Sequence, residues 1–272
     1  MTATIYCEDY VETVERLYRA DERVNLVITS PPYNTNRKQG RSRTLLNTDA
    51  KGGQPWVRYD LVQDDMTQEE YCDFLCTFMV DMDSVLAEDG VVLLNLGYGN
   101  ENPDGVWKAV ASIIEGTEFT VADCIVWKKR NAMPNNCSPN RLTRICEFIF
   151  VLARKDELKT FHMNKEVRSV RKTGQKSYGN VMNYLTAANN DGPCPYNKAT
   201  FSSELVGKLL KMYAKEGALV YDPFMGSGTT LAACQKLGFD SIGSEVSELQ
   251  CRWAAEHVEG SVLEVADGEE GE

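Results

Sequence analysis

The sequence lacks the features of a membrane-bound or secreted protein. No stretch among its 272 residues approaches the roughly 20 uncharged apolar residues that a membrane helix needs. The opening residues, MTATIYCEDYVETVER, bring in an acidic side chain as early as Glu8 and contain no apolar core of a signal peptide. We therefore expect no membrane partner for this chain.

Histidine is scarce, and cysteine shows no pairing pattern. There are two histidines, and the nine cysteines have no Cys-x-x-Cys spacing. We therefore expect neither a structural zinc site nor a framework of disulfide bonds, and we assign no metal ligand. An odd number of scattered cysteines fits the reducing cytoplasm, which is the location that we expect.

Positive charge is in deficit overall, but it is concentrated. Forty Asp and Glu residues oppose 29 Lys and Arg residues, which gives a formal charge of −11. Between Trp127 and Lys176, thirteen basic residues face only four acidic ones, whereas residues 256–272 carry seven acidic side chains and no Lys or Arg. Contact with phosphates depends on local charge, so the net acidity does not exclude a nucleic-acid partner.

Apolar segments of strand length alternate with amphipathic segments of helix length. The expected strands are 24–30, 90–97, 120–127, 145–153, 218–222 and 241–245, and the expected helices are 67–87, 106–114, 202–215, 229–237 and 247–257. Strands separated by helices predict an α/β fold, in which a mostly parallel sheet carries helices on both faces. Residues 34 to about 65 are polar with few periodic apolar positions, so we expect a loop insert there.

The segment ALVYDPFMGSGTTLAACQKLG has the strand, glycine turn and helix of a nucleotide-type cofactor site. Gly226 and Gly228 allow a tight turn and close approach of a ligand, and the helix that starts near Thr229 presents free N–H groups. Glu245 ends the next strand, where an acidic side chain can accept hydrogen bonds from ribose hydroxyls. The third glycine of a dinucleotide site and the Gly-Lys-Ser/Thr of a P-loop are missing, so NAD and ATP phosphate sites are disfavoured. A glycine-lined packing turn is the alternative.

The segment VITSPPYN places Ser30, Pro31, Pro32 and Tyr33 where a buried strand ends, and active crevices of open α/β sheets lie at that end. The two prolines fix the backbone, so Pro31 offers a rigidly aimed carbonyl. Ser30 adds a hydroxyl acceptor, and Tyr33 a flat ring for stacking. Two acceptors beside an aromatic ring suit the exocyclic amino group of a flipped nucleobase. A proline turn packed by a tyrosine is the alternative if the motif is taken alone.

Together these motifs resemble the β-type amino-methyltransferases of DNA, which use S-adenosylmethionine. In that family Ser/Asp-Pro-Pro-Tyr precedes Phe-x-Gly-x-Gly, as SPPYN precedes FMGSGT here. The segments IVWKKRNAMPNN, RLTRICEFIFVLARK and GSEVSELQCRWA are similar to further family segments, so the resemblance covers most of the chain. It implies a Rossmann-like methyltransferase fold with circularly permuted motif order and a small recognition insert.

The resemblance also implies roles for individual residues. Ser30 and the Pro31 carbonyl would hold the target amino group, with Pro32 in the same turn and Tyr33 stacking on the flipped base. The cofactor pocket would comprise Asp9, Asp222, Phe224, Gly226, Ser227, Gly228, Thr229 and Glu245. Asp9 follows Glu8 where the family has glycine. Asn197 and Ser202 replace a family histidine and proline, so we assign no cofactor role there.

The implied reaction is direct attack of the amine on the sulfonium methyl group, and no cysteine nucleophile is needed. Methylation at a ring carbon is disfavoured, because none of the cysteines, Cys194 included, stands in a catalytic context. We expect methylation of N4 of cytosine, which Ser30 favours within the family. The alternatives are an N6-adenine DNA methyltransferase, an RNA or free-nucleotide methyltransferase, and a non-catalytic DNA-binding module with a relic cofactor pocket.

We expect double-stranded DNA as the partner, and the resemblance is compatible with a homodimer and a cognate restriction endonuclease. The expected parts are a catalytic part (1–154, with the insert at 34–65), a target-recognition segment (155–195), a cofactor part (196–258) and an acidic tail (259–272). The predicted DNA-binding residues are Arg37, Lys38, Arg41, Arg43, Lys128, Lys129, Arg130, Arg168, Arg171 and Lys172.

Overall fold

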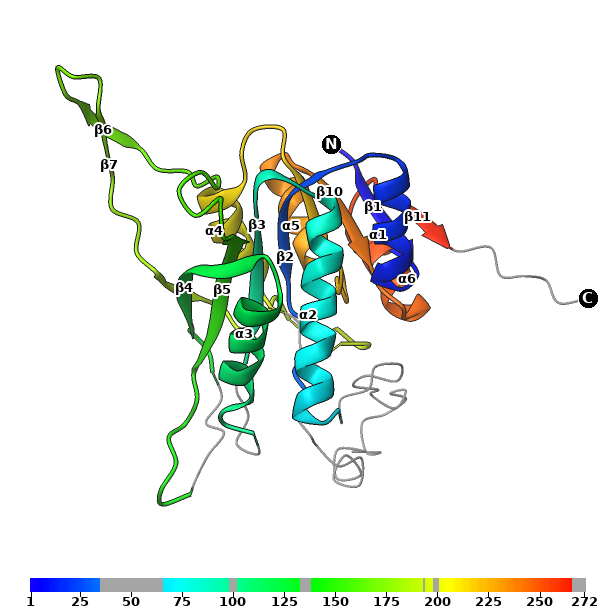
Figure 1. Cartoon of the computed structure of the whole chain (residues 1–272). Coiled ribbons are helices and arrows are strands. Elements are labelled where there is room, and N and C mark those ends of the chain that lie inside the picture. The colour runs from blue at the N-terminus through cyan, green and yellow to red at the C-terminus, as the bar shows by residue number, and fades with distance from the viewer. Residues whose placement is uncertain (35–65, 98–101, 133–137, 193, 198–200, 266–272) are drawn as a thin grey trace, which may run out of the picture.

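The computed structural model describes residues 1–34, 66–97, 102–132, 138–192, 194–197 and 201–265 (Figure 1). Nine strands form one sheet in the order β11-β1-β10-β9-β2-β3-β5-β4-β8. Their bounds are β1 (Ala3–Cys7), β2 (Val24–Thr29), β3 (Leu86–Leu96), β4 (Phe119–Lys129), β5 (Cys146–Arg154), β8 (Tyr184–Ala187), β9 (Leu219–Asp222), β10 (Asp240–Ser244) and β11 (Val262–Val265). Only β5 runs antiparallel to its neighbours, β3 and β4, which confirms the predicted mostly parallel sheet.

Helices cover both faces of the sheet, as the alternation of segments predicted. One face packs against α1 (Tyr10–Arg19), α2 (Gln68–Val85) and α3 (Gly105–Gly116), and the other against α4 (Ser203–Tyr213), α5 (Thr229–Leu237) and α6 (Glu248–His257). Successive side chains of β2 alternate between the two cores: Val27 points to one, and Leu26 and Ile28 to the other. Both faces of the central strands are therefore buried and shielded from water, which explains their continuous apolar sequence.

Local sequence signals locate several helix ends. Thr67 and Glu70 form the capping box of α2, because the Thr67 hydroxyl accepts from the Glu70 amide and the Glu70 carboxylate accepts from the Thr67 amide. Helix α5 begins after Gly228 and ends at Gly238, both with left-handed backbone conformation.

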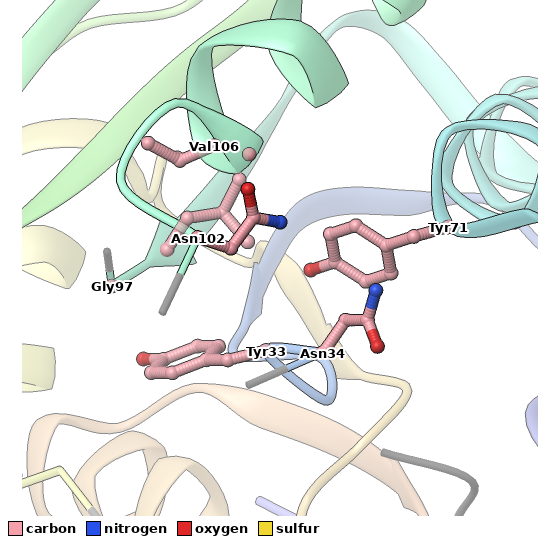
Figure 2. A pocket seen from close by; sticks show the side chains of 8 residues that line it. Tyr33, Asn34, Tyr71, Gly97, Asn102 and Val106 are labelled. Atoms are coloured by element: carbon pink, nitrogen blue, oxygen red, sulfur yellow. The ribbon is translucent and has the colours of Figure 1, made fainter. Parts of the chain in front are cut away.

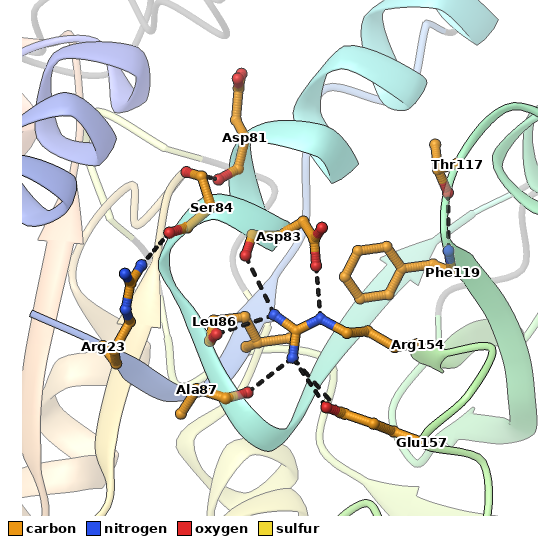
Figure 3. A network of polar contacts seen from close by, with 10 residues as sticks. All are labelled: Arg23, Asp81, Asp83, Ser84, Leu86, Ala87, Thr117, Phe119, Arg154 and Glu157. Atoms are coloured by element: carbon orange, nitrogen blue, oxygen red, sulfur yellow. Dashed lines mark hydrogen bonds and ion pairs between the residues drawn. The ribbon is translucent and has the colours of Figure 1, made fainter. Parts of the chain in front are cut away.

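Some of the expected boundaries are wrong. Helix α2 ends at Val85 rather than Ala87, and β3 begins at Leu86, so Gly90 lies inside the strand and does not close the helix. The side chain of Arg154 explains this junction (Figure 3): its guanidinium donates to the carbonyl oxygens of Asp83, Leu86 and Ala87 at 3.1, 2.9 and 3.0 Å. Arg154 lies far along the sequence, so no local pattern reveals this cap.

The C-terminal region also differs from expectation. Residues 259–272 were expected to form a frayed tail, yet Val262–Val265 form β11, which pairs in parallel with β1 at the sheet edge. Its register places Ile5 beside Leu263, and Leu263 packs against the adjoining core. Pairing of backbone groups along β1 thus outweighs the local excess of acidic side chains.

A short hairpin, β6 (Val167–Val170) and β7 (Lys176–Tyr178), extends away from the sheet (Figure 1). The segment before it is anchored where β3 begins, because the His162 amide donates to the Asp89 carbonyl at 2.8 Å. The hairpin therefore projects from the end of the sheet where β3 begins, which is opposite to the end where β2 and β9 terminate. Among the described residues, no helix combines the length and apolarity that a membrane crossing requires.

Candidate active site

The two sequence motifs meet at one edge of the sheet. Strands β2 and β9 are parallel neighbours, with Leu26 beside Val220 and Val27 beside Tyr221. The Ser-Pro-Pro-Tyr turn and the glycine turn follow the C-terminal ends of these two strands. A hydrogen bond of 2.8 Å from the Thr29 hydroxyl to Asp222 Oδ1 joins the ends directly. Segments nearly two hundred residues apart thus meet at the topological switch point of the sheet.

The glycine turn has a backbone conformation that favours glycine at two positions. Gly226 has φ 55° and Gly228 has φ 81°. A Cβ at position 226 would lie 2.5 Å from Asn197 Nδ2, and one at position 228 would lie 2.8 Å from Ala254 Cβ. The positive φ favours glycine at both positions, and at Gly228 the Ala254 Cβ also leaves no room for a side chain.

Glu245 follows β10 and holds this turn in place. Its Oε2 accepts from the Gly226 amide at 3.1 Å and its Oε1 from the Ser247 amide at 2.9 Å. Burial raises the pKa of Glu245 above its usual value, and these backbone donors partly offset the rise. A carboxylate has more acceptor sites than these two bonds use, so hydroxyl groups of a ligand can also donate to it.

Asp222 is fully buried and bound entirely by donors. Its Oδ1 accepts from Thr29 and from the Phe224 amide at 3.2 Å, and its Oδ2 accepts from the Thr230 hydroxyl. Burial raises the pKa of Asp222 to about 6, although the three hydrogen bonds favour the charged form. A buried negative charge therefore lies beneath the glycine turn at neutral pH.

These residues fit S-adenosylmethionine, which carries a positive sulfonium, an adenine and ribose hydroxyls. Gln250 of α6 provides a direct observation: its Oε1 is buried without a hydrogen-bond partner in the described part of the chain, and it faces Gly226. Such an acceptor calls for a donor from a ligand. Gln250 and Asn197 both lie against the turn, and neither was assigned a cofactor role from the sequence.

The remaining predicted cofactor residues lie around the same turn. Phe224 is half-buried and packs against Tyr10 and Phe78, with ring centroids 5.2 and 5.6 Å apart. Ser227 is part of the turn, and Thr229 is the first residue of α5. Asp9 is exposed at the same sheet edge, where its carboxylate caps α1 by accepting from the Val11 amide at 3.0 Å. Contact of Asp9 with adenine stays a prediction.

A polar network surrounds the Ser-Pro-Pro-Tyr turn. The Ser30 hydroxyl donates to Tyr33 Oη at 2.8 Å, and Tyr33 Oη donates to Glu147 Oε2 at 3.2 Å. Asn95, near the end of β3, donates from Nδ2 to Tyr33 Oη at 2.6 Å and to Glu147 Oε2 at 3.0 Å. Pro31 is buried and Pro32 half-buried between these polar groups.

Lys129 completes this network. Its ammonium group pairs with Glu147 Oε1 and lies 4.9 Å from the centroid of the Trp127 ring. The side chains of Lys129 and Glu147 are 20% and 15% exposed. Lys129 was predicted to contact DNA; the structure shows it in an ion pair with Glu147, and its contact with DNA stays a prediction. Asn95 and Glu147 were not predicted as site residues; Glu147 belongs to a segment that carried the family resemblance.

A pocket of about 370 Å³, including the solvent at its mouth, lies beside Tyr33 (Figure 2). Its walls come from the Ser-Pro-Pro-Tyr turn, the end of β3 and the N-terminal parts of α2 and α3; they include Asn34, Tyr71, Gly97, Asn102 and Val106. A Cβ at Gly97 would approach the Tyr33 ring to 3.0 Å, so glycine lets this ring lie against the backbone of β3's end.

The predicted DNA-binding residues do not gather in one place. Lys128 is exposed at the active-site end of β4. Arg130, just beyond it, pairs with Glu204, and hydrogen bonds from Lys208, the Ala188 amide and Arg130 lower the pKa of Glu204 to about 2. The hairpin at the opposite edge carries Arg168, Arg171 and Lys172. The other predicted contacts, Arg37, Lys38, Arg41 and Arg43 of the insert, lie outside the described residues.

Comparison with known proteins identifies relatives over most of the chain. The model of a family described as DNA methylase matches residues 24–256. Type II methyltransferase M.MjaI of Methanocaldococcus jannaschii is 24% identical over 252 residues, which is 84% of this chain and 82% of the relative. Type II methyltransferase M.Cfr9I of Citrobacter freundii is 27% identical over 279 residues, covering 90% and 84%.

Solved structures show the same fold. The PvuII DNA methyltransferase (cytosine-N4-specific) aligns with a TM-score of 0.63 at 16% identity, over 97% of this chain and 95% of its own. The M1.HpyAVI–SAM complex aligns with a TM-score of 0.59 at 19% identity, over 95% and 100% of the two chains. Nearly the whole chain is therefore accounted for by one fold.

Proposed function

Because the chain belongs to the N6/N4 DNA methylase family and is an S-adenosylmethionine-dependent DNA amino-methyltransferase, we propose that it methylates N4 of cytosine within a specific DNA sequence. The observation that carries the proposal is the position of Ser30. Its hydroxyl stands at the end of β2, next to the strand that bears the glycine turn, and its proton is directed to Tyr33. A neutral acceptor is thereby presented at the site where an amine must be held.

The chain's own groups account for the catalysis that this reaction needs. An aromatic amine is a poor nucleophile because its lone pair is delocalised into the ring. Accepting hydrogen bonds from the amine, Ser30 Oγ and the Pro31 carbonyl favour a tetrahedral nitrogen whose lone pair is available. S-adenosylmethionine, when bound, supplies an electrophilic methyl group. Glu245, Gln250 and the glycine turn would hold it, and the buried carboxylate of Asp222 favours a cationic ligand.

We further propose that the target base is flipped out of the duplex and stacks on Tyr33. The hydroxyl of Tyr33 is tied to three neighbours, and its ring lies against Gly97. The pocket beside Tyr33 lies against this ring. Double-stranded DNA would approach this edge, where Lys128 is exposed. A homodimer, a cognate restriction endonuclease and a cytoplasmic location stay predictions.

The test is transfer of tritiated methyl groups to genomic DNA, followed by mass spectrometry of the nucleosides. N4-methylcytosine supports the proposal, and N6-methyladenine contradicts it while leaving the amino-methyltransferase activity in place. Absence of label despite cofactor binding would instead support a non-catalytic module.

Two variants test the assigned residues. Ser30→Ala and Tyr33→Ala should abolish methyl transfer while S-adenosylmethionine still binds, because neither side chain belongs to the glycine turn. Tyr178→Ala, on the exposed hairpin, is the matched control and should retain cofactor binding. Loss of cofactor affinity in Ser30→Ala and Tyr33→Ala alike would contradict their roles.

A further inference from the structure

Glu147 lies at the active-site edge because β5 is antiparallel. Glu147 is the second residue of β5 and pairs with Trp127 near the end of β4. The beginning of β5 therefore lies beside the ends of β3 and β4. Its two oxygens have different partners. Oε1 accepts from Lys129, and Oε2 accepts from Asn95 Nδ2 and from Tyr33 Oη.

The chemistry of these partners determines which way every proton points. An ammonium group and an amide nitrogen can only donate, and a carboxylate can only accept. Tyr33 Oη accepts a hydrogen bond from Asn95, and it donates its own proton to the carboxylate of Glu147, which can only accept. The Ser30 hydroxyl then donates its own proton to Tyr33 Oη. Asn95 Nδ2 also donates to Ser30 Oγ, at 3.5 Å, so Ser30 can offer a further ligand only its remaining lone pair.

We propose that Glu147 is a positioning residue that, acting through the Tyr33 hydroxyl, makes Ser30 an obligate hydrogen-bond acceptor for the target amine. The inference rests on the proposed function, since it concerns how Ser30 receives the substrate. If Ser30 could point its proton at the amine, it would withdraw the lone pair that must attack. The Glu147 carboxylate, which ends this series of hydrogen bonds, prevents that orientation. Lys129 holds the carboxylate in place from the other side.

The variant Glu147→Gln tests the direction of these hydrogen bonds, because glutamine has nearly the same shape as glutamate. Glutamine has one acceptor oxygen and one donor nitrogen. Lys129 can only donate, so it takes the oxygen, and the amide nitrogen of the glutamine then faces Tyr33 Oη and Asn95 Nδ2. Tyr33 loses its acceptor and turns its proton toward Ser30. The hydroxyl of Ser30 is then free to donate to the substrate.

Removing Lys129 from this variant should reverse the defect. In the double variant Lys129→Met/Glu147→Gln, nothing competes for the glutamine oxygen, which can turn toward Tyr33 and restore the original direction. A purely structural role of the ion pair predicts the opposite, because the double variant loses both charges. Rescue by the double variant would therefore distinguish an effect on hydrogen-bond direction from an effect on the stability of the fold.

The experiment measures single-turnover methyl transfer to DNA at saturating S-adenosylmethionine, with cofactor affinity and circular dichroism as controls. We expect Glu147→Gln to slow transfer by about 100-fold, as the loss of one oriented group in a catalytic site does. Lys129→Met/Glu147→Gln should recover about tenfold of that loss, with cofactor affinity unchanged in both. A double variant no faster than Glu147→Gln, or a Glu147→Gln variant as fast as the wild type, would overturn the inference.

A double-mutant cycle between Tyr33 and Glu147 tests the inference if the variant Lys129→Met/Glu147→Gln does not fold. Tyr33→Phe removes the hydroxyl that transmits the effect, so Glu147→Gln should cause no further loss of rate in that background. Equal losses in both backgrounds would contradict the inference. The wild-type enzyme provides the separate check: no methyl transfer at all by the wild type refutes the proposed function, whereas an active wild type with the wrong variant pattern refutes only the role of Glu147.

Discussion

Replacing Asp222 by asparagine should make the protein more stable and a weaker binder of its cofactor. The pKa of Asp222 is about 6 in the folded chain and 3.8 in the reference state. Each pKa unit corresponds to about 1.4 kcal/mol, so the charged carboxylate costs the folded state about 3 kcal/mol above pH 6. Asparagine keeps an oxygen for Thr29 and the Phe224 amide, and the Thr230 hydroxyl can rotate to accept from its amide nitrogen.

The size of this effect depends on pH. A carboxyl group whose pKa is raised by folding favours the folded state below pH 3.8 and loses that contribution as pH rises through about 6. The stability advantage of Asp222→Asn should therefore be greatest above pH 6 and vanish below about pH 4. For a chain of this length, we expect the variant to melt about 5 °C above the wild type at pH 7.5.

The assay is calorimetric melting of both proteins from pH 7.5 to 4.5, with titration of S-adenosylmethionine at pH 7.5. The variant should bind the cofactor about tenfold more weakly, because it lacks the buried charge beneath the glycine turn. Asp156→Asn, which changes an exposed carboxylate on the loop after β5, is the control and should melt like the wild type. An Asp222→Asn variant that melts below the wild type at pH 7.5, or whose advantage grows as pH falls, would refute this reasoning.

Three further predictions follow from single contacts. Gly226→Ala should lower the affinity for S-adenosylmethionine at least about tenfold in calorimetric titration, because φ is 55°, a backbone conformation that alanine adopts only with strain; unchanged binding would contradict this role of the glycine turn. Arg154→Met should lower the free energy of unfolding in urea by about 3 kcal/mol, because it leaves Asp83 and three carbonyl oxygens without their donor; a loss within error of zero would refute that role. Lys128→Ala should reduce the slope of log affinity against log salt for DNA by about one; an unchanged slope would mean that Lys128 makes no phosphate contact.

Several features could be predicted because consecutive residues encode them. Thr67 with Glu70 begins one helix, and Gly228 with Gly238 bounds another, since capping needs only neighbouring backbone groups. The Ser-Pro-Pro-Tyr and glycine turns likewise carry their conformation in a few adjacent side chains. Alternation of apolar and amphipathic segments was enough to predict a mostly parallel sheet covered on both faces.

Other features could not be predicted because they depend on partners far away in the sequence. The end of α2 depends on Arg154, and β11 exists because β1 offers an unpaired edge. Residues 155–195 were expected to form a target-recognition segment. Their hairpin projects from the end of the sheet opposite to the active site (Figure 1), and counting charges along the sequence cannot reveal this position. Recognition by this segment stays a prediction.

The sequence by itself thus determined the chemistry of the site: two acceptors beside a tyrosine, and a glycine turn followed by an acidic residue. Only the tertiary structure decided how these groups are oriented. The order and register of the strands bring Asn95 and Glu147 to Tyr33, and they give Lys129 an ion pair instead of a free basic side chain. The physical reason is that turn and cap conformations arise from short-range contacts, whereas the direction of a hydrogen-bond chain depends on which distant strands lie side by side.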